Sequence, residues 1–372
     1  MTATMTTARL VAQRMANQGL THRPAADPAQ AARICAGIQA QDLWASRLAV
    51  RSRSATAGLA DVIAATEAPP QVIRTWPMRG TLHLVAAEDA RWLIETVGPT
   101  VLRASSKRRR DLGLDDALLN RLRAALPDVL TGRQLTRPEL VETLGRRGIG
   151  LGPDNQAAAH VVYWAAATGL ICRGPDRGAQ STFVLLEEWL PDRTGPTGEA
   201  ALAELARRHV RAFGPVSSED FAAWSRLPMP MCRAAFGAIG AEVETVTVDD
   251  RPLVMIEPVE PGRNVLRLLA GFDTYLMGYR SRDAMLHSSR HKRIVDGGIL
   301  YPSMMLDGTL LGRWRLDRSR EPARVSVEFF DPPPRGVRQQ LDAEVADIAR
   351  FLDREVRLVE GWSRAGRGLV EG

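Results

Sequence analysis

The 372-residue chain is poor in lysine and cysteine. It has two lysines, Lys107 and Lys292, so chemistry that needs an amine nucleophile has few candidates. The three cysteines (Cys35, Cys172 and Cys232) are odd in number, far apart and surrounded by apolar residues. Because they show neither CxxC nor Cys/His metal spacing, we predict packing residues, and neither a disulfide framework nor a zinc site.

Long apolar runs and the common enzyme signatures are also missing. No stretch approaches the roughly 18 apolar residues of a membrane span, and the Thr-rich segment 1–13 lacks the core of a secretory signal, so we expect a cytoplasmic protein without membrane association. The chain has no P-loop, GxSxG, HExxH or useful GxGxxG motif, and we expect no cofactor and no metal. Its 45% hydrophobic and 25% charged residues are typical of a globular protein, and its length predicts two to four domains.

Positive charge is present, and nearly all of it is arginine. The 49 Lys+Arg exceed the 43 Asp+Glu, which gives a net charge of +6. A GC-rich genome explains most of this bias, but planar guanidinium groups also suit phosphate. Since so small an excess does not establish nucleic-acid binding, the clustering of the arginines has to be considered.

A helix–turn–helix–hairpin pattern, typical of a winged helix, stands in the middle of the chain. Thr136 and Glu139 form a capping box that predicts the start of a helix. A second helical stretch covers about 155–168, and two apolar runs around a polar Gly-Pro-Asp-Arg-Gly tip predict a hairpin over 170–186.

The same pattern recurs on both sides of this unit. Ser217 and Asp220 repeat the capping positions, and a hairpin with regular alternation follows them. Upstream, Asp27 caps a helix that runs to about Gln39, and two more helices and a hairpin over 72–85 follow. We therefore predict three winged-helix units, which cover 1–110, 111–194 and 195–262.

From residue 263 the chain changes to short strands separated by turns. Asp307-Gly308 between apolar runs is typical of a tight hairpin, and 336–354 is expected to be a terminal helix. We predict an α+β protein in which tandem winged-helix (helix-turn-helix plus wing) units are followed by a small C-terminal β-barrel over 263–372. Hairpins, rather than alternating strands and helices, argue against Rossmann and TIM-barrel folds.

Two clusters of cations are candidates for binding DNA phosphates. Arg103, Lys107 and Arg110 recur at i, i+4 and i+7 on one face of a predicted helix, with Arg108 beside them, although a solvated face would look the same. The second cluster is a predicted loop that combines hydroxyl groups and cations next to a glycine turn: Ser288, Arg290, His291, Lys292 and Arg293.

Two short segments place polar side chains on one face of an extended chain. Gln39 and Gln41 diverge on a helix but share a face in a strand, and the alternative is a pair of polar residues at a helix end. Thr81 and His83 alternate in the same way on the face opposite two leucines. A histidine in a strand more often has a structural role than a chemical one.

Four motifs in order resemble those of the AlkZ/YcaQ-like winged-helix DNA glycosylases, over about residues 5–360. They are Gln39-Ala40-Gln41, the run Trp76-Pro77-Met78-Arg79-Gly80-Thr81-Leu82-His83, the stretch Gly271–Tyr279, and Asp307-Gly308 with Gly312 and Trp314. The resemblance implies tandem winged helices and a β-barrel that hold duplex DNA, catalysis by Gln39 and Gln41, and DNA contacts from Arg79, Thr81 and His83.

The resemblance also implies the reaction, which is the removal of bulky alkylated purines by a monofunctional DNA glycosylase. The Gln-x-Gln form is that of the branch associated with unhooking azinomycin-type interstrand crosslinks, whereas relatives have Gln-x-Asp. Asp42 stands one position too far to be that carboxylate.

The chemistry of such a lesion fits an amide site. Alkylation at purine N7 puts a positive charge on the base, which then leaves without a general acid. The oxocarbenium-like sugar is stabilised by a positioned water and by partial negative charge, and a glutamine carbonyl can hold that water although it cannot deprotonate it. Strand nicking through a Schiff base is not expected from a chain with two lysines.

Two non-enzymatic interpretations remain open at this point, a winged-helix transcription regulator and a drug-adduct-binding resistance protein. Both explain the basic clusters and the missing catalytic motifs, but regulators usually read DNA through one unit per protomer, which fits three units and a β domain poorly. For the glycosylase that the resemblance implies, the expected partner is double-stranded DNA that carries alkylated or crosslinked purines, and we expect a monomer.

Overall fold

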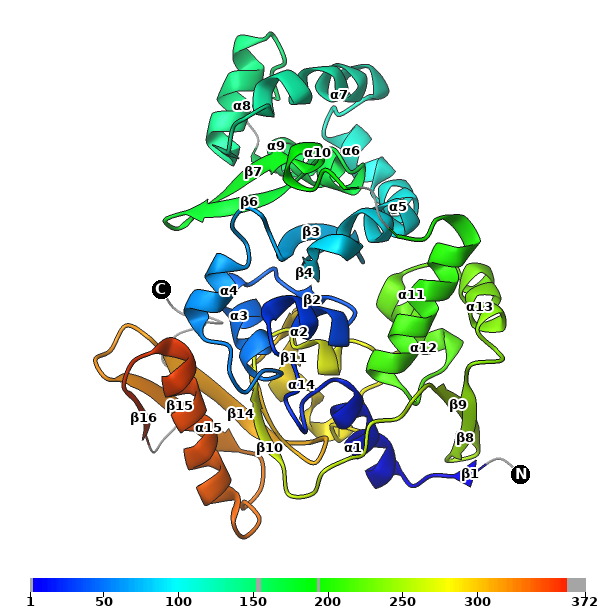
Figure 1. Ribbon diagram of the computed structural model, residues 1–372, viewed down its shortest axis with the longest axis vertical. Coiled ribbons are helices and arrows are strands. Elements are labelled where there is room, and N and C mark those ends of the chain that lie inside the picture. The colour runs from blue at the N-terminus through cyan, green and yellow to red at the C-terminus, as the bar shows by residue number, and fades with distance from the viewer. Residues whose placement is uncertain (1–2, 152–154, 193–194, 360–372) are drawn as a thin grey trace.

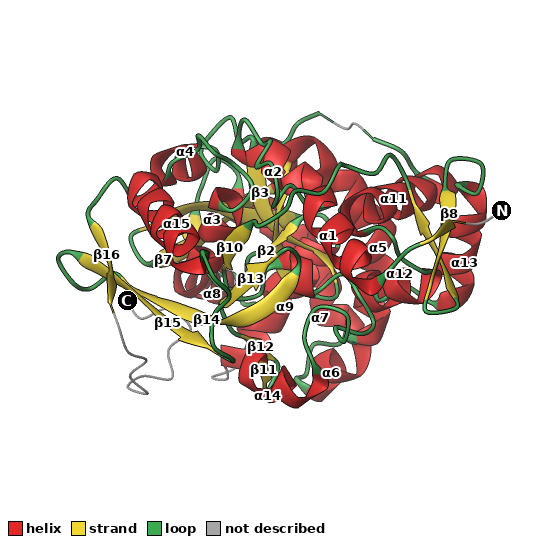
Figure 2. Ribbon diagram, turned by 90° about the horizontal axis from the view of Figure 1, so that it is seen from below, coloured by secondary structure: helices red, strands yellow, loops and turns green. Residues whose placement is uncertain are grey.

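The computed structural model describes residues 3–151, 155–192 and 195–359, which form an α+β protein (Figures 1 and 2). Among these residues, no helix is both long and apolar enough to cross a membrane. The same residues contain no group of three His, Cys, Asp or Glu side chains placed to hold a metal ion. Cys35, Cys172 and Cys232 are all buried and free, which confirms their prediction as packing residues.

A six-stranded sheet with the order β2-β4-β3-β6-β7-β5 joins the first two hairpins. Its strands are β2 (Ile38–Gln39), β3 (Val72–Met78), β4 (Thr81–Ala86), β5 (Leu135–Thr136), β6 (Ile171–Arg177) and β7 (Gln180–Leu185). Both predicted hairpins, β3–β4 and β6–β7, are present, and β3 pairs with β6 where Arg74 lies opposite Arg173. Asp176 of β6 accepts a hydrogen bond from Arg74 and so ties the two hairpins together.

The N-terminal helices lead the chain into the short strand β2. They are α1 (Thr7–Asn17), α2 (Pro28–Ile34), α3 (Leu43–Arg51) and α4 (Leu59–Ala64). Asp27 caps α2 as predicted, by accepting a bond from the backbone N–H of Gln30. The helix ends at Ile34 rather than near Gln39, because Ala36 and Gly37 adopt positive φ values of 51° and 101°.

The second unit lies at the top of Figure 1. Helices α5 (Ala87–Ala104) and α6 (Ser106–Asp111) lead into it from the first unit. Its own helices are α7 (Asp116–Leu130), α8 (Arg137–Arg146), α9 (Asn155–Ala167) and α10 (Leu186–Trp189). The predicted capping box starts α8, since the backbone N–H of Thr136 donates to Glu139 Oε2 at 2.8 Å and the Thr136 hydroxyl accepts from the N–H of Glu139. Helix α9 packs against α5, α8 and the strands β3 and β6.

The third unit lies at the right of Figure 1 and repeats the helix–helix–hairpin order. It comprises α11 (Gly198–Phe213), α12 (Ser218–Ser225), α13 (Met229–Ala238), β8 (Glu244–Val248) and β9 (Arg251–Met255). The predicted capping box at Ser217 and Asp220 is present, with the Ser217 N–H donating to Asp220 Oδ2 at 3.0 Å. The N-terminal strand β1 (Ala3–Thr4) pairs in parallel with β8 of this unit.

The C-terminal region is an open sheet and not the closed barrel that we predicted. Its five-stranded sheet has the order β10-β13-β14-β15-β16. The strands are β10 (Leu266–Leu269), β13 (Ser303–Leu306), β14 (Thr309–Asp317), β15 (Ala323–Phe329) and β16 (Val356–Val359). Helix α15 (Val337–Leu352) packs against both edge strands, β10 and β16, and the sheet therefore curves around a helix to form a half-barrel. The predicted Asp307-Gly308 hairpin turn connects β13 to β14.

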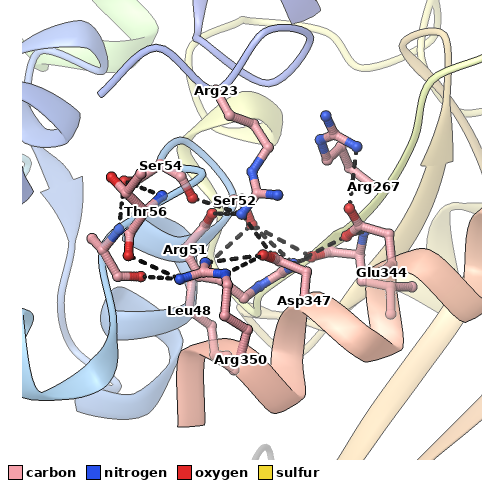
Figure 3. Close-up of polar contacts among 12 residues, drawn as sticks. Arg23, Leu48, Arg51, Ser52, Ser54, Thr56, Arg267, Glu344, Asp347 and Arg350 are labelled. Carbon is pink, nitrogen blue, oxygen red and sulfur yellow. Dashed lines mark hydrogen bonds and ion pairs between the residues drawn. The ribbon is translucent and has the colours of Figure 1, made fainter. Parts of the chain in front are cut away.

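A buried ion network joins α15 to α3 (Figure 3). Arg51, which has no exposed surface, donates to Glu344 Oε2 at 3.2 Å and to Asp347 Oδ2 at 2.6 Å. Glu344 also accepts from Arg267 at 3.1 Å, and Asp347 from Arg23 at 2.7 Å. These five residues, which we call the α15 ion network, connect the first unit to the C-terminal sheet.

Candidate functional site

Strand β2 places the two glutamines of the Gln-x-Gln motif on one face. Gln39 lies opposite His83 of β4, while Ile38 and Ala40 point into the core with 0% and 1% of their surface exposed. Gln39 Nε2 donates to Gln41 Oε1 at 2.8 Å, so the two side chains do share a face. Gln39 is buried, whereas Gln41 is exposed to solvent.

The turn of the β3–β4 hairpin aims Arg79 back at this pair. Arg79 and Gly80 both have positive φ values, of 52° and 68°, as a tight two-residue hairpin turn requires. Gly80 is needed there because a Cβ atom would lie 2.5 Å from the Tyr163 hydroxyl of α9. Arg79 Nη2 then donates to Gln39 Oε1 at 2.6 Å, and Arg79 Nη1 donates to the carbonyl of Met277 at 3.4 Å.

This contact sets the orientation of both amides. A guanidinium can only donate, so Gln39 must turn its oxygen to Arg79 and its NH₂ group to Gln41. Gln41 in turn directs its oxygen to Gln39, which leaves one lone pair of that oxygen and its own NH₂ group for other partners. No further hydrogen bond of Gln41 is found within the described ranges, and its exposed end faces solvent.

His83 lies beneath Arg79 and supports it. Its Nδ1 is 2.9 Å from the carbonyl oxygen of Thr81 and must carry the proton, so Nε2 is the acceptor that faces Arg79 Nη2 at 3.4 Å. Burial, and next the charge of Arg79, lower the pKa of His83 to about 3, so the ring is neutral. With 1% of its surface exposed, His83 does not reach the surface for a direct DNA contact in this conformation.

Two further arginines, which the sequence analysis did not single out, lie near Arg79. Arg226 follows α12 with a φ of 64° and is exposed, and Arg282 donates through Nε to the carbonyl of Leu276 at 2.5 Å. Burial, and then the charges of Arg226 and Arg282, lower the pKa of Arg79 to about 10. Among the described residues none of these three arginines, which we call the arginine triad, forms an ion pair.

The Gly271–Tyr279 motif builds the turn that holds two arginines of the triad. Its short helix η1 (Thr274–Leu276) is capped by Asp273, which accepts from the N–H of Tyr275 at 2.9 Å and pairs with the buried Arg53 at 2.8 Å. Gly278 lies against Phe213 so closely that a Cβ atom would clash with the ring. The motif therefore has a structural purpose, since it presents the carbonyls of Leu276 and Met277 to the guanidinium groups.

Comparison with known proteins identifies the family of the chain. A model of the family described as DNA glycosylase AlkZ-like matches residues 32–351. The chain belongs to this family. The interstrand DNA cross-link repair glycosylase of Streptomyces sahachiroi is 28% identical over 334 residues, which cover 86% of this chain and 88% of that protein. The solved structure of Streptomyces sahachiroi DNA glycosylase AlkZ superposes with a TM-score of 0.78 at 25% identity and covers 96% of this chain and 100% of that one.

These matches confirm the family that the four sequence motifs predicted. The protein is an AlkZ-like DNA glycosylase, and the two non-enzymatic interpretations are not supported. The shared fold is the α+β arrangement described above.

The first basic cluster of the glycosylase lies on two helices and not on one. Helix α5 ends at Ala104 and α6 begins at Ser106, so the predicted single face from Arg103 to Arg110 is interrupted at Ser105. Lys107 is 82% exposed and pairs with Asp111 at 2.8 Å. Arg108, which contacts Gln156, and Arg110 are exposed as well. We call Lys107, Arg108 and Arg110 the α6 basic cluster.

The second basic cluster is helical where we predicted a loop. Ser288–Arg290 form the short helix η2, and His291–Ile294 form α14, ahead of the two short strands β11 (Val295–Asp296) and β12 (Ile299–Leu300). Acidic side chains already neutralise two of its cations, since Arg290 pairs with Asp331 at 2.6 Å and Arg293 with Glu328 at 2.8 Å.

The remaining residues of this second cluster differ in their surroundings. His291 Nε2 lies 3.5 Å from Asp283, whereas Lys292 is exposed and has no ion pair in the part of the chain that the structure describes. Ser288 is exposed too. Lys292 is thus better placed than its two neighbouring arginines to meet a phosphate.

Proposed function

We propose that this glycosylase hydrolyses the N-glycosidic bond of bulky N7-alkylated purines and unhooks interstrand crosslinks, without lyase activity. The hydrogen-bonded pair of Gln39 and Gln41 carries the proposal, because it is a neutral site with an oriented oxygen at the surface. The Streptomyces sahachiroi relative is an interstrand DNA cross-link repair glycosylase, which supports the same reaction here.

In the proposed reaction the two glutamines have different tasks. The free lone pair of Gln41 Oε1 accepts a hydrogen bond from a water, whose oxygen attacks C1′ of the sugar as the C1′–N9 bond breaks. The electron pair of that bond neutralises the positive charge on the alkylated base, and the attacking water loses its proton to solvent. Gln39 is a positioning residue, since its oxygen is taken by Arg79 and its NH₂ group holds Gln41.

The lack of a general acid or base at the glutamine pair, within the described residues, restricts the substrate. No carboxylate or charged histidine takes part, because Asp42 caps α3 by accepting from the N–H of Ala45 at 2.9 Å and the pKa of His83 is about 3. A site of this kind can assist a leaving group that is already cationic but cannot protonate a neutral base. The selectivity for alkylated purines therefore follows from chemistry and not from a tight pocket.

The same proposal includes the organisation of the protein. The three helix–helix–hairpin segments act as winged-helix units, with boundaries at 1–110, 111–194 and 195–262, and the half-barrel region covers 263–372. The glycosylase acts as a monomer in the cytoplasm on duplex DNA. Its contacts to the DNA backbone come from the arginine triad, Thr81, Arg103, the α6 basic cluster and the segment 288–293.

The experiment compares Gln41→Ala and Gln39→Ala with the wild type on a duplex that contains one N7-alkylguanine. We expect Gln41→Ala to abolish release of the base and formation of alkali-labile sites, and Gln39→Ala to slow release strongly, while affinity for DNA stays within a few-fold. Gln339→Ala, on the exposed face of α15, is the matched control and should release base at the wild-type rate. Wild-type rates in folded Gln41→Ala and Gln39→Ala proteins would refute the assignment.

A further inference from the structure

We propose that Arg79, Arg226 and Arg282 together bind one phosphate of the DNA backbone next to the lesion. The proposal rests on the proposed function, because it takes DNA as the ligand. It assigns a binding task to Arg226 and Arg282 and places the phosphate beside Gln39 and Gln41.

The three side chains come from three separate elements, and the charges of Arg226 and Arg282 both act on Arg79. Arg79 belongs to the β3–β4 turn, Arg226 follows α12, and Arg282 follows η1. Arg79 and Arg282 donate to the successive carbonyls of Met277 and Leu276, so their guanidinium groups are held by the same turn. Asp220 of α12 accepts from the N–H of Arg280 at 2.9 Å and so fixes α12 to that segment.

The charges of the triad are not neutralised inside the protein. Two fully buried arginines of this chain have carboxylate partners, since Arg53 pairs with Asp273 and Arg51 pairs with Glu344 and Asp347. In the described residues no acidic group pairs with a member of the triad, and the positive charges of Arg226 and Arg282 lower the pKa of Arg79. Like charges held together at a partly buried place are stabilised when an external anion joins them, and guanidinium forks match a phosphate group.

Binding of a phosphate also resolves a conflict at the catalytic site. The positive charge of Arg79, which is hydrogen-bonded to Gln39, and the charges of Arg226 and Arg282 near it would oppose the positive charge that develops on the sugar. A backbone phosphate between the arginines offsets one of these positive charges before the bond breaks. Since Arg79 also holds Gln39, phosphate binding and the orientation of the amides depend on the same side chain.

The test measures binding, so it does not need catalysis. The ligand is a duplex with a single tetrahydrofuran abasic analogue, and the variants are Arg226→Gln and Arg282→Gln. Arg357→Gln is the control, because Arg357 is exposed on β16 and pairs with Glu355. We expect each triad variant to bind roughly tenfold more weakly, the effect of one lost charge-assisted hydrogen bond, and its log–log salt slope to become shallower by about 0.9.

A methylphosphonate scan of the same duplex then locates the phosphate. Replacing the contacted phosphate by a neutral methylphosphonate should weaken binding by the wild type. The triad variants, which have already lost this contact, should bind that substituted duplex as tightly as they bind the unmodified one. Arg282→Lys keeps the charge and should retain the salt slope, which separates phosphate binding from a folding defect. The proposal would be overturned if Arg226→Gln and Arg282→Gln both kept the wild-type salt slope. It would also be overturned if the loss of affinity from each variant added to the loss from methylphosphonate substitution at every phosphate position.

The outcomes separate this inference from the proposed function. If the wild type releases no alkylated base but the triad variants change the salt slope, the phosphate site stands and the proposed reaction fails. If base is released while the salt slopes do not change, the reaction stands and the phosphate site fails.

Discussion

Replacing Glu344 by glutamine tests the α15 ion network, which joins the N-terminal segment to the C-terminal sheet. The carboxylate is 4% exposed and accepts from Arg51, from Arg267 and from the backbone N–H of Leu268 at 2.9 Å. Glu344→Gln keeps the shape of the side chain but removes its charge and points an NH₂ group at a guanidinium or a backbone N–H. Two arginines are then left with less negative charge in a buried place.

The expected loss of stability follows from this burial. Removing one partner of a buried ion pair costs about 3–5 kcal/mol, and the lower value applies because the amide oxygen can still accept one bond. For a chain of this length the entropy of unfolding at the melting temperature is about 0.8 kcal/mol per kelvin. A loss of about 3 kcal/mol in the free energy of unfolding therefore lowers Tm by about 4 °C. Glu355→Gln removes an exposed ion pair with Arg357 and should cost less than about 1 kcal/mol.

Differential scanning calorimetry of the full chain, supported by urea unfolding, measures both variants. The pH dependence gives a second check through Asp347. Burial alone would raise the pKa of Asp347, but Arg51 and Arg23 outweigh it and lower this pKa below the ordinary value of 3.8. Its contribution to stability is therefore complete above that value and is lost as the pH falls through the folded-state pKa. Equal Tm values for Glu344→Gln and Glu355→Gln would refute this account of the network.

Three further predictions concern the DNA-binding and catalytic residues. Because the pKa of His83 is about 3 and glutamines do not titrate, the rate of base release should be flat from about pH 5 to about pH 8, and a step near the ordinary histidine value would contradict a neutral His83. Neutralising the α6 basic cluster should weaken binding to every duplex and flatten the salt slope by about 0.9 per lost contact; an unchanged slope would identify a solvated face. His291→Ala with Lys292→Ala should slow excision from alkylated DNA more than it weakens binding to undamaged duplex, with Lys292 dominant because His291 already lies near Asp283. Equal losses on the two substrates would assign both residues to general electrostatics.

The features that could be predicted from the sequence are those determined over a few residues. The capping boxes at Thr136 and Ser217 and the turns at Arg79-Gly80 and Asp307-Gly308 formed as expected, since each depends on side chains or glycines close in the chain. Gln39 and Gln41 share a face, as the extended alternative of the sequence analysis predicted, and their hydrogen bond is seen only in the structure.

The features that could not be predicted depend on distant contacts. Nothing local to Arg226 or Arg282 indicates that the fold brings them to Arg79. The open C-terminal sheet could not be distinguished from a closed barrel, because its strands alternate in the same way and the difference lies in α15, which packs against both edges. The helix ends near Ser105 although the basic spacing continues past it, so the charge pattern alone was a poor guide to the helix boundary.

The contact between Arg79 and Gln39 has a consequence for how this site could change its chemistry. Gln39 offers an NH₂ group to residue 41, and an amide oxygen or a carboxylate oxygen can receive it equally well. The strand, the hairpin turn and the buried histidine would keep their places if Gln41 were an aspartate, although its shorter side chain would hold the acceptor oxygen closer to the backbone. Arg79 and Gln39 therefore orient the acceptor oxygen of residue 41 whether that residue is basic or not. A substitution at this one position would convert a site that only positions the water into one that can also accept its proton.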